Sequence, residues 1–189
     1  IPPGMPGHSP EIGLPYDPQR ARDALACARY SAGRDLAPAN LLTFSSLEPY
    51  AERLVSHWQK TLGVEIELQV VEYGQFVERM KEVPPRMFLS GWTADYPDPD
   101  NFLRVSPIQR YARWRSGPYT ELVEAARLAN APEERLDLYR RADGLLIREA
   151  VIMPLAYMRR HLLVKPWIKK LPMSPTKHWF WKDVVIVAH

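Results

Sequence analysis

The hydrophobic pattern in the middle of the chain alternates between two periods, and this alternation limits the folds that the chain can adopt. Short apolar or alternating runs, which are typical of strands, are separated by stretches with helical spacing. The predicted strands are Leu41 to Ser45, Val64 to Val70 and Arg86 to Ser90, and the predicted helices run from Ser46 or Glu48 to Leu62 and from Tyr73 to Lys81. Strands that are joined by helices through short connections form parallel, right-handed units. The sequence therefore predicts an α/β fold with a mainly parallel sheet.

The N-terminal part of the chain carries one further helix signal. Asp17 can cap a helix whose first position is Pro18. Before it, Ile1 to Pro15 is rich in proline and glycine, which predicts an irregular, extended lead-in, and Ser31 to Asn40 is a predicted loop. Cys27 is the only cysteine, so an internal disulfide is impossible. Its small apolar neighbours on the helix predict that Cys27 is a core residue.

The C-terminal half predicts two helices followed by strands. An irregular stretch is expected at residues 104–117, and the helices are expected to begin at Pro118 and Ala131. Apolar runs then predict strands at Val151 to Tyr157, His161 to Val164 and Val184 to Ala188. No apolar run in the sequence approaches the length of about eighteen residues that a membrane-spanning helix needs.

The third predicted strand ends in a segment, residues 91–103, that cannot continue it. Gly91, Pro97 and Pro99 interrupt any ladder or long helix there, and Trp92 and Asp95 lie inside the break. In open α/β sheets, ligands bind beyond the carboxyl ends of the strands. One interpretation is therefore a binding segment, and the other is an acidic surface turn with Trp92 packed beneath it.

Several motifs in this chain resemble one known family. The segment Gly91-Trp92-x-Ala94-Asp95-Tyr96-x-x-Pro99-x-x-Phe102-Leu103 resembles the signature of the family 5 extracellular solute-binding proteins. Further matching motifs, in the family's order, are Tyr16-Asp17-Pro18, Trp58 with Leu62-Gly63-Val64, Val164-Lys165-Pro166-Trp167 and Val184-Val185-Ile186. The resemblance extends from about Tyr16 to His189.

The resemblance implies a fold, a function and a location. It implies a three-layer, periplasmic-binding-protein-like lobe of the type II solute-binding fold, with residues 16–189 forming the C-terminal lobe and residues 1–15 the lead-in. The N-terminal lobe would be absent, so the chain would be a fragment that holds half of a ligand cleft. The ligand would be an oligopeptide or dipeptide, delivered to the permease of an ABC importer in the membrane. The location would be extracytoplasmic, either periplasmic or as a cell-surface lipoprotein, and no cofactor is implied.

The resemblance also implies four ligand-binding residues. Asp95 would pair with the α-ammonium of the ligand, and Trp92 and Thr93 would line the ligand channel. Tyr73 would form an aromatic pocket wall. Two alternatives remain open at this point, namely that Trp92 is a core residue and that Tyr73 packs on the core at the start of its helix.

Other function classes have less support in the sequence. The histidines show no metal-ligand spacing, and the aspartates at 95, 98 and 100 lack the glycine and glutamate of a calcium loop. No nucleophile elbow or phosphate loop is present, so the sequence predicts no enzyme and no metal site.

Two further alternatives concern a nucleic-acid partner and a different domain context for the same fold. The formal net charge of +3 is mild. Arg110, Arg113 and Arg115 alternate with aromatics that could stack nucleic-acid bases, but such a pattern is more often a solvated loop with its aromatics turned in, and we predict no nucleic-acid partner. The alternative function is a ligand-sensing module of the same fold, fused to a cytoplasmic transcriptional regulator.

Overall fold

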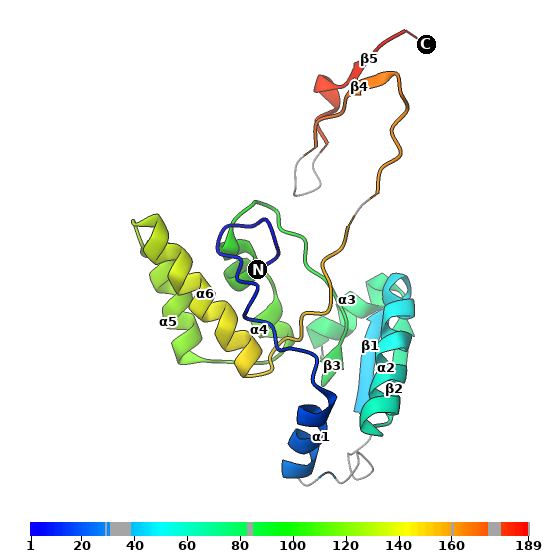
Figure 1. Cartoon of the computed structure of the whole chain (residues 1–189), viewed down its shortest axis with the longest axis vertical. Helices are drawn as coiled ribbons and strands as arrows, with labels where there is room; N and C mark the ends of the chain where they lie inside the picture. The colour runs from blue at the N-terminus through cyan, green and yellow to red at the C-terminus, as the bar shows by residue number, and fades with distance from the viewer. Residues whose placement is uncertain (29, 31–38, 83–84, 160, 174–178, 189) are drawn as a thin grey trace. The chain divides into compact units, whose positions relative to one another are not determined.

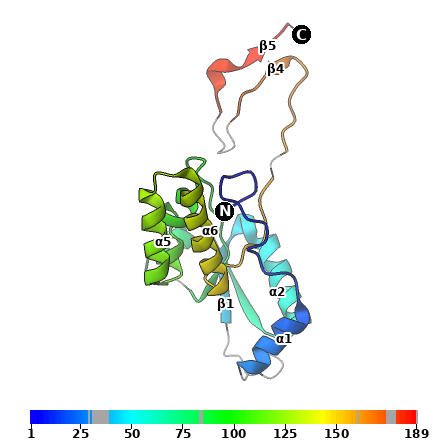
Figure 2. The ribbon, with the colours of Figure 1, turned by 60° about the vertical axis from the view of Figure 1, so that its left-hand side comes forward.

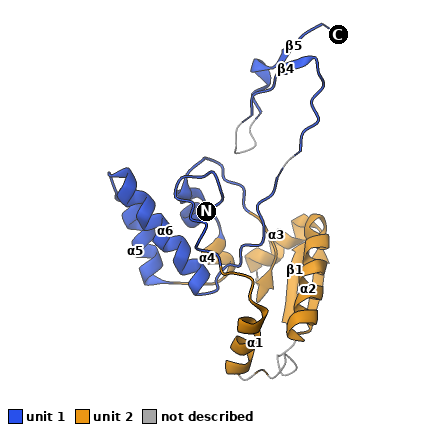
Figure 3. Ribbon diagram, viewed as in Figure 1, with its two compact units in different colours: residues 1–13, 92–107, 116–189 blue, residues 14–91, 108–115 orange. Residues whose placement is uncertain are grey.

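The structure is a computed structural model that describes residues 1–28, 30, 39–82, 85–159, 161–173 and 179–188; Figures 1 and 2 show its elements from two directions. The chain divides into two compact units, which Figure 3 distinguishes by colour. The sheet unit comprises residues 14–91 and 108–115. The helical unit comprises residues 1–13, 92–107 and 116–189.

The sheet unit is built on three parallel strands in the order β2-β1-β3. The strands are β1 (Ala39–Phe44), β2 (Ile66–Val71) and β3 (Met87–Phe88). Leu41 of β1 pairs with Leu68 on one side and with Met87 on the other. The pairing continues past β3, because Leu89 N donates to Leu42 O at 2.9 Å. The predicted α/β class and parallel sheet are confirmed.

Helices cover both faces of this sheet. The connecting helices are α2 (Glu48–Leu62), which follows the short turn η2 (Ser45–Leu47), and α3 (Tyr73–Glu82). The two crossovers run in opposite directions from β1 to β2 and from β2 to β3, so right-handed connections place α2 and α3 on opposite faces. On the α3 face, Leu42 of β1 forms a buried cluster with Phe76 and Met80. Gly63 ends α2 at φ +68°, the left-handed conformation that favours glycine.

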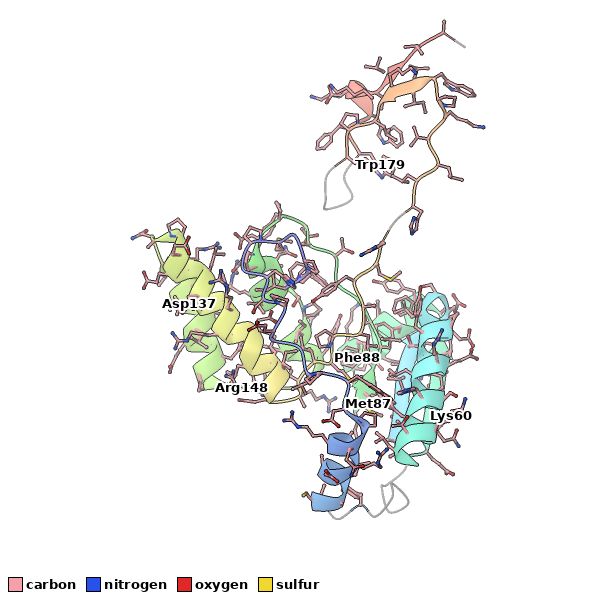
Figure 4. All side chains as sticks on the ribbon, viewed as in Figure 1. Lys60, Met87, Phe88, Asp137, Arg148 and Trp179 are labelled. Atoms are coloured by element: carbon pink, nitrogen blue, oxygen red, sulfur yellow. The ribbon has the colours of Figure 1, made fainter. Side chains whose placement is uncertain are left out.

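The strand order creates a topological switch point between β1 and β3. The chain leaves β1 toward β2 and then crosses back to the other side of β1. A crevice at the carboxyl ends of two such strands is the usual ligand position in open α/β sheets. Met87 and Phe88, labelled in Figure 4, form β3, and the chain runs from β3 directly into residues 89–95. The segment that carries Trp92 and Asp95 thus follows in the chain directly after β3.

The helix α1 (Pro18–Cys27) corrects one expectation. Its predicted cap is present, since Asp17 Oδ1 accepts a hydrogen bond from Arg20 N at 2.9 Å. However, α1 contains no buried residue and Cys27 is exposed, so the prediction of a core cysteine is wrong. The helix α1 contacts α2 through the exposed side chain of Arg22, which donates a hydrogen bond to Thr61 O at 3.3 Å. Most of the predicted loop at 31–40 lies outside the described residues.

The stretch at 104–117 is also more ordered than the sequence predicts. A π-helical turn, η3 (Asn101–Val105), and a short helix, α4 (Ile108–Tyr111), occupy part of it. In the sheet unit, Tyr111 of α4 packs edge-on against Phe88 with 6.1 Å between ring centroids. The prediction of an irregular stretch missed these helices because each is shorter than the window in which helical spacing can be recognised.

In the helical unit, α5 (Gly117–Leu128) and α6 (Pro132–Arg148) pack side by side, as Figures 1 and 2 both show. Both predicted helices are confirmed. The buried hydrophobic side chains of the pair are Tyr119, Val123, Ala126, Tyr139, Ala142, Leu146 and Ile147. The Tyr119 hydroxyl donates to Leu103 O at 2.7 Å. This bond ties the hairpin to the segment that follows Trp92.

The first thirteen residues pack on the same unit without forming a helix or strand. Gly7 has φ +78°, and a Cβ at this position would lie 3.3 Å from Pro99 and 3.4 Å from Leu136. The Ile1 nitrogen donates to Asp143 Oδ2 at 2.9 Å. The backbone of this lead-in therefore lies close to the loop around Pro99.

The C-terminal segment differs most from the sequence prediction. It forms one small antiparallel hairpin, β4 (Ile168–Lys170) and β5 (Val185–Ile186), with the turn η4 (Trp181–Asp183) before β5. Trp179, labelled in Figure 4, stacks on Trp181 at 5.3 Å. The strand at the end is confirmed in shortened form. The predicted strands at 151–157 and 161–164 are wrong, because no described residue offers them a ladder partner and their side chains are largely exposed.

Candidate functional site

The segment that follows β3 is organised around one buried side chain, Asn101. Its side chain is fully buried. Asn101 Oδ1 accepts hydrogen bonds from Trp92 Nε1 at 2.8 Å and from Asp95 N at 3.2 Å. Asn101 Nδ2 donates to Asp95 Oδ2 at 3.3 Å. A single amide therefore holds both the indole and the carboxylate that the sequence singles out.

The residues predicted to contact ligand lie at the surface of this loop. Trp92 is 39% exposed, so it is not a fully buried core residue. Thr93 and Asp95 are exposed, whereas Ala94 between them is buried at 5% exposure. The buried Ala94 anchors the loop and leaves its neighbours in contact with solvent. The arrangement presents an aromatic face and a carboxylate from one short stretch of chain.

A second acid of this segment, Asp100, is buried and accepts several hydrogen bonds. Its carboxylate accepts from the Tyr96 hydroxyl at 2.7 Å, from the Tyr139 hydroxyl at 3.0 Å and from Arg104 at 2.7 and 2.6 Å. Burial acts to raise the pKa of Asp100. The hydrogen bonds from Arg104, Tyr96 and Tyr139 and the charge of Arg104 outweigh it, so the pKa lies below its usual value. Burial, together with the bond to this carboxylate, raises the pKa of Tyr139 to about 12.

The lowered pKa of Asp100 predicts a pH-dependent contribution to stability. The contribution is fully present above the ordinary carboxylate pKa of about 4 and is lost as the pH falls through the lower, folded-state pKa. We expect Asp100→Asn to lower the free energy of unfolding by about 2 kcal/mol at neutral pH, since hydrogen bonds to a buried charge are lost. The difference from the unchanged protein should shrink as the pH falls below the ordinary carboxylate pKa of about 4 and the folded-state carboxylate becomes protonated.

Urea unfolding followed by circular dichroism at several pH values measures this difference. Asp137→Asn, on the exposed face of α6 (Figure 4), is the matched control and should leave stability almost unchanged. A stability difference that is equally large at acid and neutral pH would contradict the assignment.

A third acid, Asp98, joins the loop to α6. Its carboxylate binds Arg135 of α6 through two hydrogen bonds of 2.8 and 2.9 Å, and it also accepts from Asp100 N at 2.9 Å. The three acids of the loop thus point to three different partners. Within the described part of the chain, no group of three potential metal-ligating side chains comes together.

The fourth predicted ligand residue, Tyr73, belongs to the sheet unit. It begins α3 just beyond the carboxyl end of β2, and its ring is 62% exposed. The ring lies edge-on to Phe44 at the end of β1, with 5.1 Å between centroids. Ser45, one residue further, donates to Glu72 Oε1 at 3.0 Å. Tyr73 is therefore exposed at the carboxyl edge of the sheet and is not enclosed in the core.

A surface groove elsewhere on the helical unit contains none of these residues. It has a volume of about 300 Å³ and lies between α5 and α6. Its lining includes Leu122, Leu138 and Arg141.

Of the helices that the structure describes, none is both long and apolar enough to cross a membrane.

Sequence reasoning identified the exposed residues of the loop but missed those that hold them. Asn101 and Asp100 lie in the turn-forming run Asp98-Pro99-Asp100-Asn101, where short polar side chains commonly bond nearby backbone groups. That signal could have marked Asn101 as a loop organiser. Arg135 and Tyr139 reach the loop from α6 and carry no local signal.

Comparison with known proteins gives a consistent result. The family model for bacterial extracellular solute-binding proteins, family 5 Middle, matches residues 1–107. The dipeptide-binding protein of Escherichia coli K12 is 26% identical over 196 residues, which cover 95% of this chain and 36% of that protein. The periplasmic oligopeptide-binding protein OppA of Salmonella typhimurium is 27% identical over 176 residues, covering 90% of this chain and 32% of OppA.

A solved structure supports the same fold. The murein tripeptide binding protein MppA of Escherichia coli superimposes with a TM-score of 0.82 at 23% identity, covering 100% of this chain and 39% of MppA. The three-layer α/β architecture is thus shared with a binding protein of known structure. The chain spans about a third of the length of the relatives that it matches.

Proposed function

Because the chain belongs to the family 5 bacterial extracellular solute-binding proteins, we propose that it supplies part of the ligand site of a peptide-binding protein that serves an ABC importer. The family is one of solute-binding proteins and not of enzymes. Relatives named for dipeptide and oligopeptide binding support a peptide ligand. The observation that carries the proposal is the exposed Asp95 carboxylate, which is held by Asn101 in a loop beside Trp92.

Asp95 is proposed to bind the α-ammonium of the peptide. An ammonium is a compact cation with three donors, and a carboxylate accepts such donors strongly when water is excluded around the pair. Asp95 Oδ1 receives no hydrogen bond from the described residues, whereas Oδ2 accepts from Asn101. One carboxylate oxygen is thus available to an ammonium in the unliganded loop.

The other three residues are also proposed to contact the ligand. The half-exposed indole of Trp92 offers apolar area beside the carboxylate, and Thr93 is proposed to line the ligand channel next to it. The exposed Tyr73 of the sheet unit is proposed as a further aromatic contact. Aromatic contact does not select particular side chains strongly, which suits a broad range of peptides.

We further propose that the chain works within a longer protein of the size of its relatives. Residues 16–189 would form its C-terminal lobe, with residues 1–15 as a lead-in and an N-terminal lobe supplying the opposite wall of the cleft. Such a protein would act outside the cytoplasm, as the name of the periplasmic relative suggests. It would deliver ligand to a membrane permease.

The test of this function is calorimetry on the longer protein that carries the chain. The titrants are an equimolar pool of dipeptides and tripeptides and the same pool acetylated at the amino terminus. We expect the free-amino pool to bind more tightly than the acetylated pool by a factor of about one hundred or more, because only peptides with a free amino terminus carry an ammonium. Absence of binding by either pool would contradict the proposed function.

A further inference from the structure

We infer that Asn101 is a positioning residue of the proposed ammonium site, which fixes the Asp95 carboxylate and the Trp92 ring as one unit. The inference rests on the proposed function of Asp95 and adds a residue that neither touches the exposed surface nor contacts ligand. Three hydrogen bonds from one buried amide carry it.

The orientation of the Asn101 amide is determined by its surroundings. Oδ1 faces two N–H donors, the Trp92 indole and the Asp95 backbone, and neither donor can act as an acceptor. Turning the amide over would place its NH2 group against both donors and leave all of them unpaired. The NH2 group must therefore face Asp95, where it donates to Oδ2.

This fixed orientation makes the two oxygens of Asp95 unequal. Oδ2 is held by the amide of Asn101, and Oδ1 is left for a ligand. Because the same amide oxygen also binds the indole N–H, the ring cannot rotate without losing its 2.8 Å bond. An approaching ammonium thus meets a carboxylate and an aromatic ring whose relative placement is set before binding, which lowers the ordering cost of association.

The backbone at Asn101 supports the same geometry. Asn101 begins the π-helical turn η3, in which Ser106 N donates to Asn101 O at 3.1 Å. Single π-turns of this kind are frequent at functional sites. The neighbouring Asp100 is fixed by Arg104 and Tyr139, so the residue before Asn101 is also held. Hydrogen bonds at Asn101 and at Asp100 therefore hold the backbone that carries the Asn101 side chain.

The test compares Asn101→Ala and Asn101→Ser with the unchanged longer protein, using the free-amino and acetylated peptide pools. A positioning role predicts that affinity for the free-amino pool falls about tenfold or more, as expected when a hydrogen bond to a charged group is lost. Affinity for the acetylated pool should fall by much less, because those peptides lose only the support that Asn101 gives to Trp92. Asn130→Ala, in the exposed connection between α5 and α6, is the matched control and should change neither affinity.

Two additional measurements separate positioning from a purely structural role. Combining Asn101→Ser with Asp95→Ala should cause a much smaller further loss than Asn101→Ser causes alone, because Asn101 acts mainly through Asp95. In the 189-residue chain, the indole 15N–1H resonance of Trp92, assigned by its absence in Trp92→Phe, should move in the Asn101 variants and stay in place in Asn130→Ala.

The outcomes distinguish this inference from the function on which it rests. Equal losses for both pools, additive losses with Asp95→Ala, or an unchanged preference for free amino termini would each overturn the role of Asn101. If Asn101→Ala does not fold, the Asn101→Ser variant decides by the same criteria. If Asp95→Ala itself leaves the preference intact, the proposed role of Asp95 is wrong and the role of Asn101 is wrong with it, whereas the proposed peptide binding is contradicted only if neither pool binds.

Discussion

Replacing Asp95 by alanine in the longer protein is expected to weaken the binding of peptides with a free amino terminus by about two to three orders of magnitude. Breaking an enclosed ion pair by removing one partner costs about 3–5 kcal/mol, since the other charge is left without compensation. Peptides that are acetylated at the amino terminus carry no ammonium and should lose little. Calorimetry with the two peptide pools measures both effects on the same protein.

Two variants sharpen the interpretation of Asp95→Ala. Asp95→Asn keeps the shape and an acceptor but removes the charge, so it should lose most of the same affinity. Asp137→Ala removes an exposed acid from α6 and should leave binding unchanged. Equal losses for free-amino and acetylated peptides in Asp95→Ala would show that Asp95 stabilises the loop and does not bind the ligand.

The second large effect is expected when the 189-residue chain is compared with the longer protein. The chain alone should bind the peptide pool weakly or undetectably, at dissociation constants of about 1 mM or above. Sites that bind small ligands well enclose about 70–90% of the ligand surface. Here Trp92 and Asp95 are open to solvent, where an ion pair contributes only up to about 1 kcal/mol.

The comparison requires that the chain alone is folded, which circular dichroism and dispersed amide resonances can establish. Calorimetry and resonance shifts on titration with the free-amino pool then measure its affinity. If the folded chain binds as tightly as the longer protein, the proposal that a second lobe completes the site is wrong.

The sheet could be predicted because its determinants are local. The alternation at Val64 to Val70 and the helical stripe before it depend only on neighbouring residues, and Gly63 marks the end of α2 by its left-handed backbone. The parallel pairing follows because a helix between two strands returns the chain to the end of the sheet at which the first strand began. Gly91 and Pro97 marked the loop because they interrupt a strand, and the resemblance to the solute-binding family singled out its exposed residues.

The errors have a common physical cause, which is that a sequence pattern does not identify its partner. The run at 151–157 is apolar enough for a strand but has no neighbouring strand among the described residues. Cys27 lies in a small apolar stripe, and α1 buries none of its residues. Asn101 was missed for the same reason: a polar residue in a turn indicates local hydrogen bonding, but it does not show that the side chain is buried or that Trp92 and Asp95 are its partners.

The hydrogen bonds that join Trp92, Asp95 and Asn101 link residues at most nine positions apart. Closing so short a segment costs little chain entropy, so its geometry can form early in folding and depends weakly on distant substitutions. The group proposed to bind the ligand's charge, Asp95 with Asn101, is thereby encoded separately from the residues that would determine ligand size and shape. Descendants of such a protein can alter those residues and acquire new cargo while the charge-binding group is inherited intact.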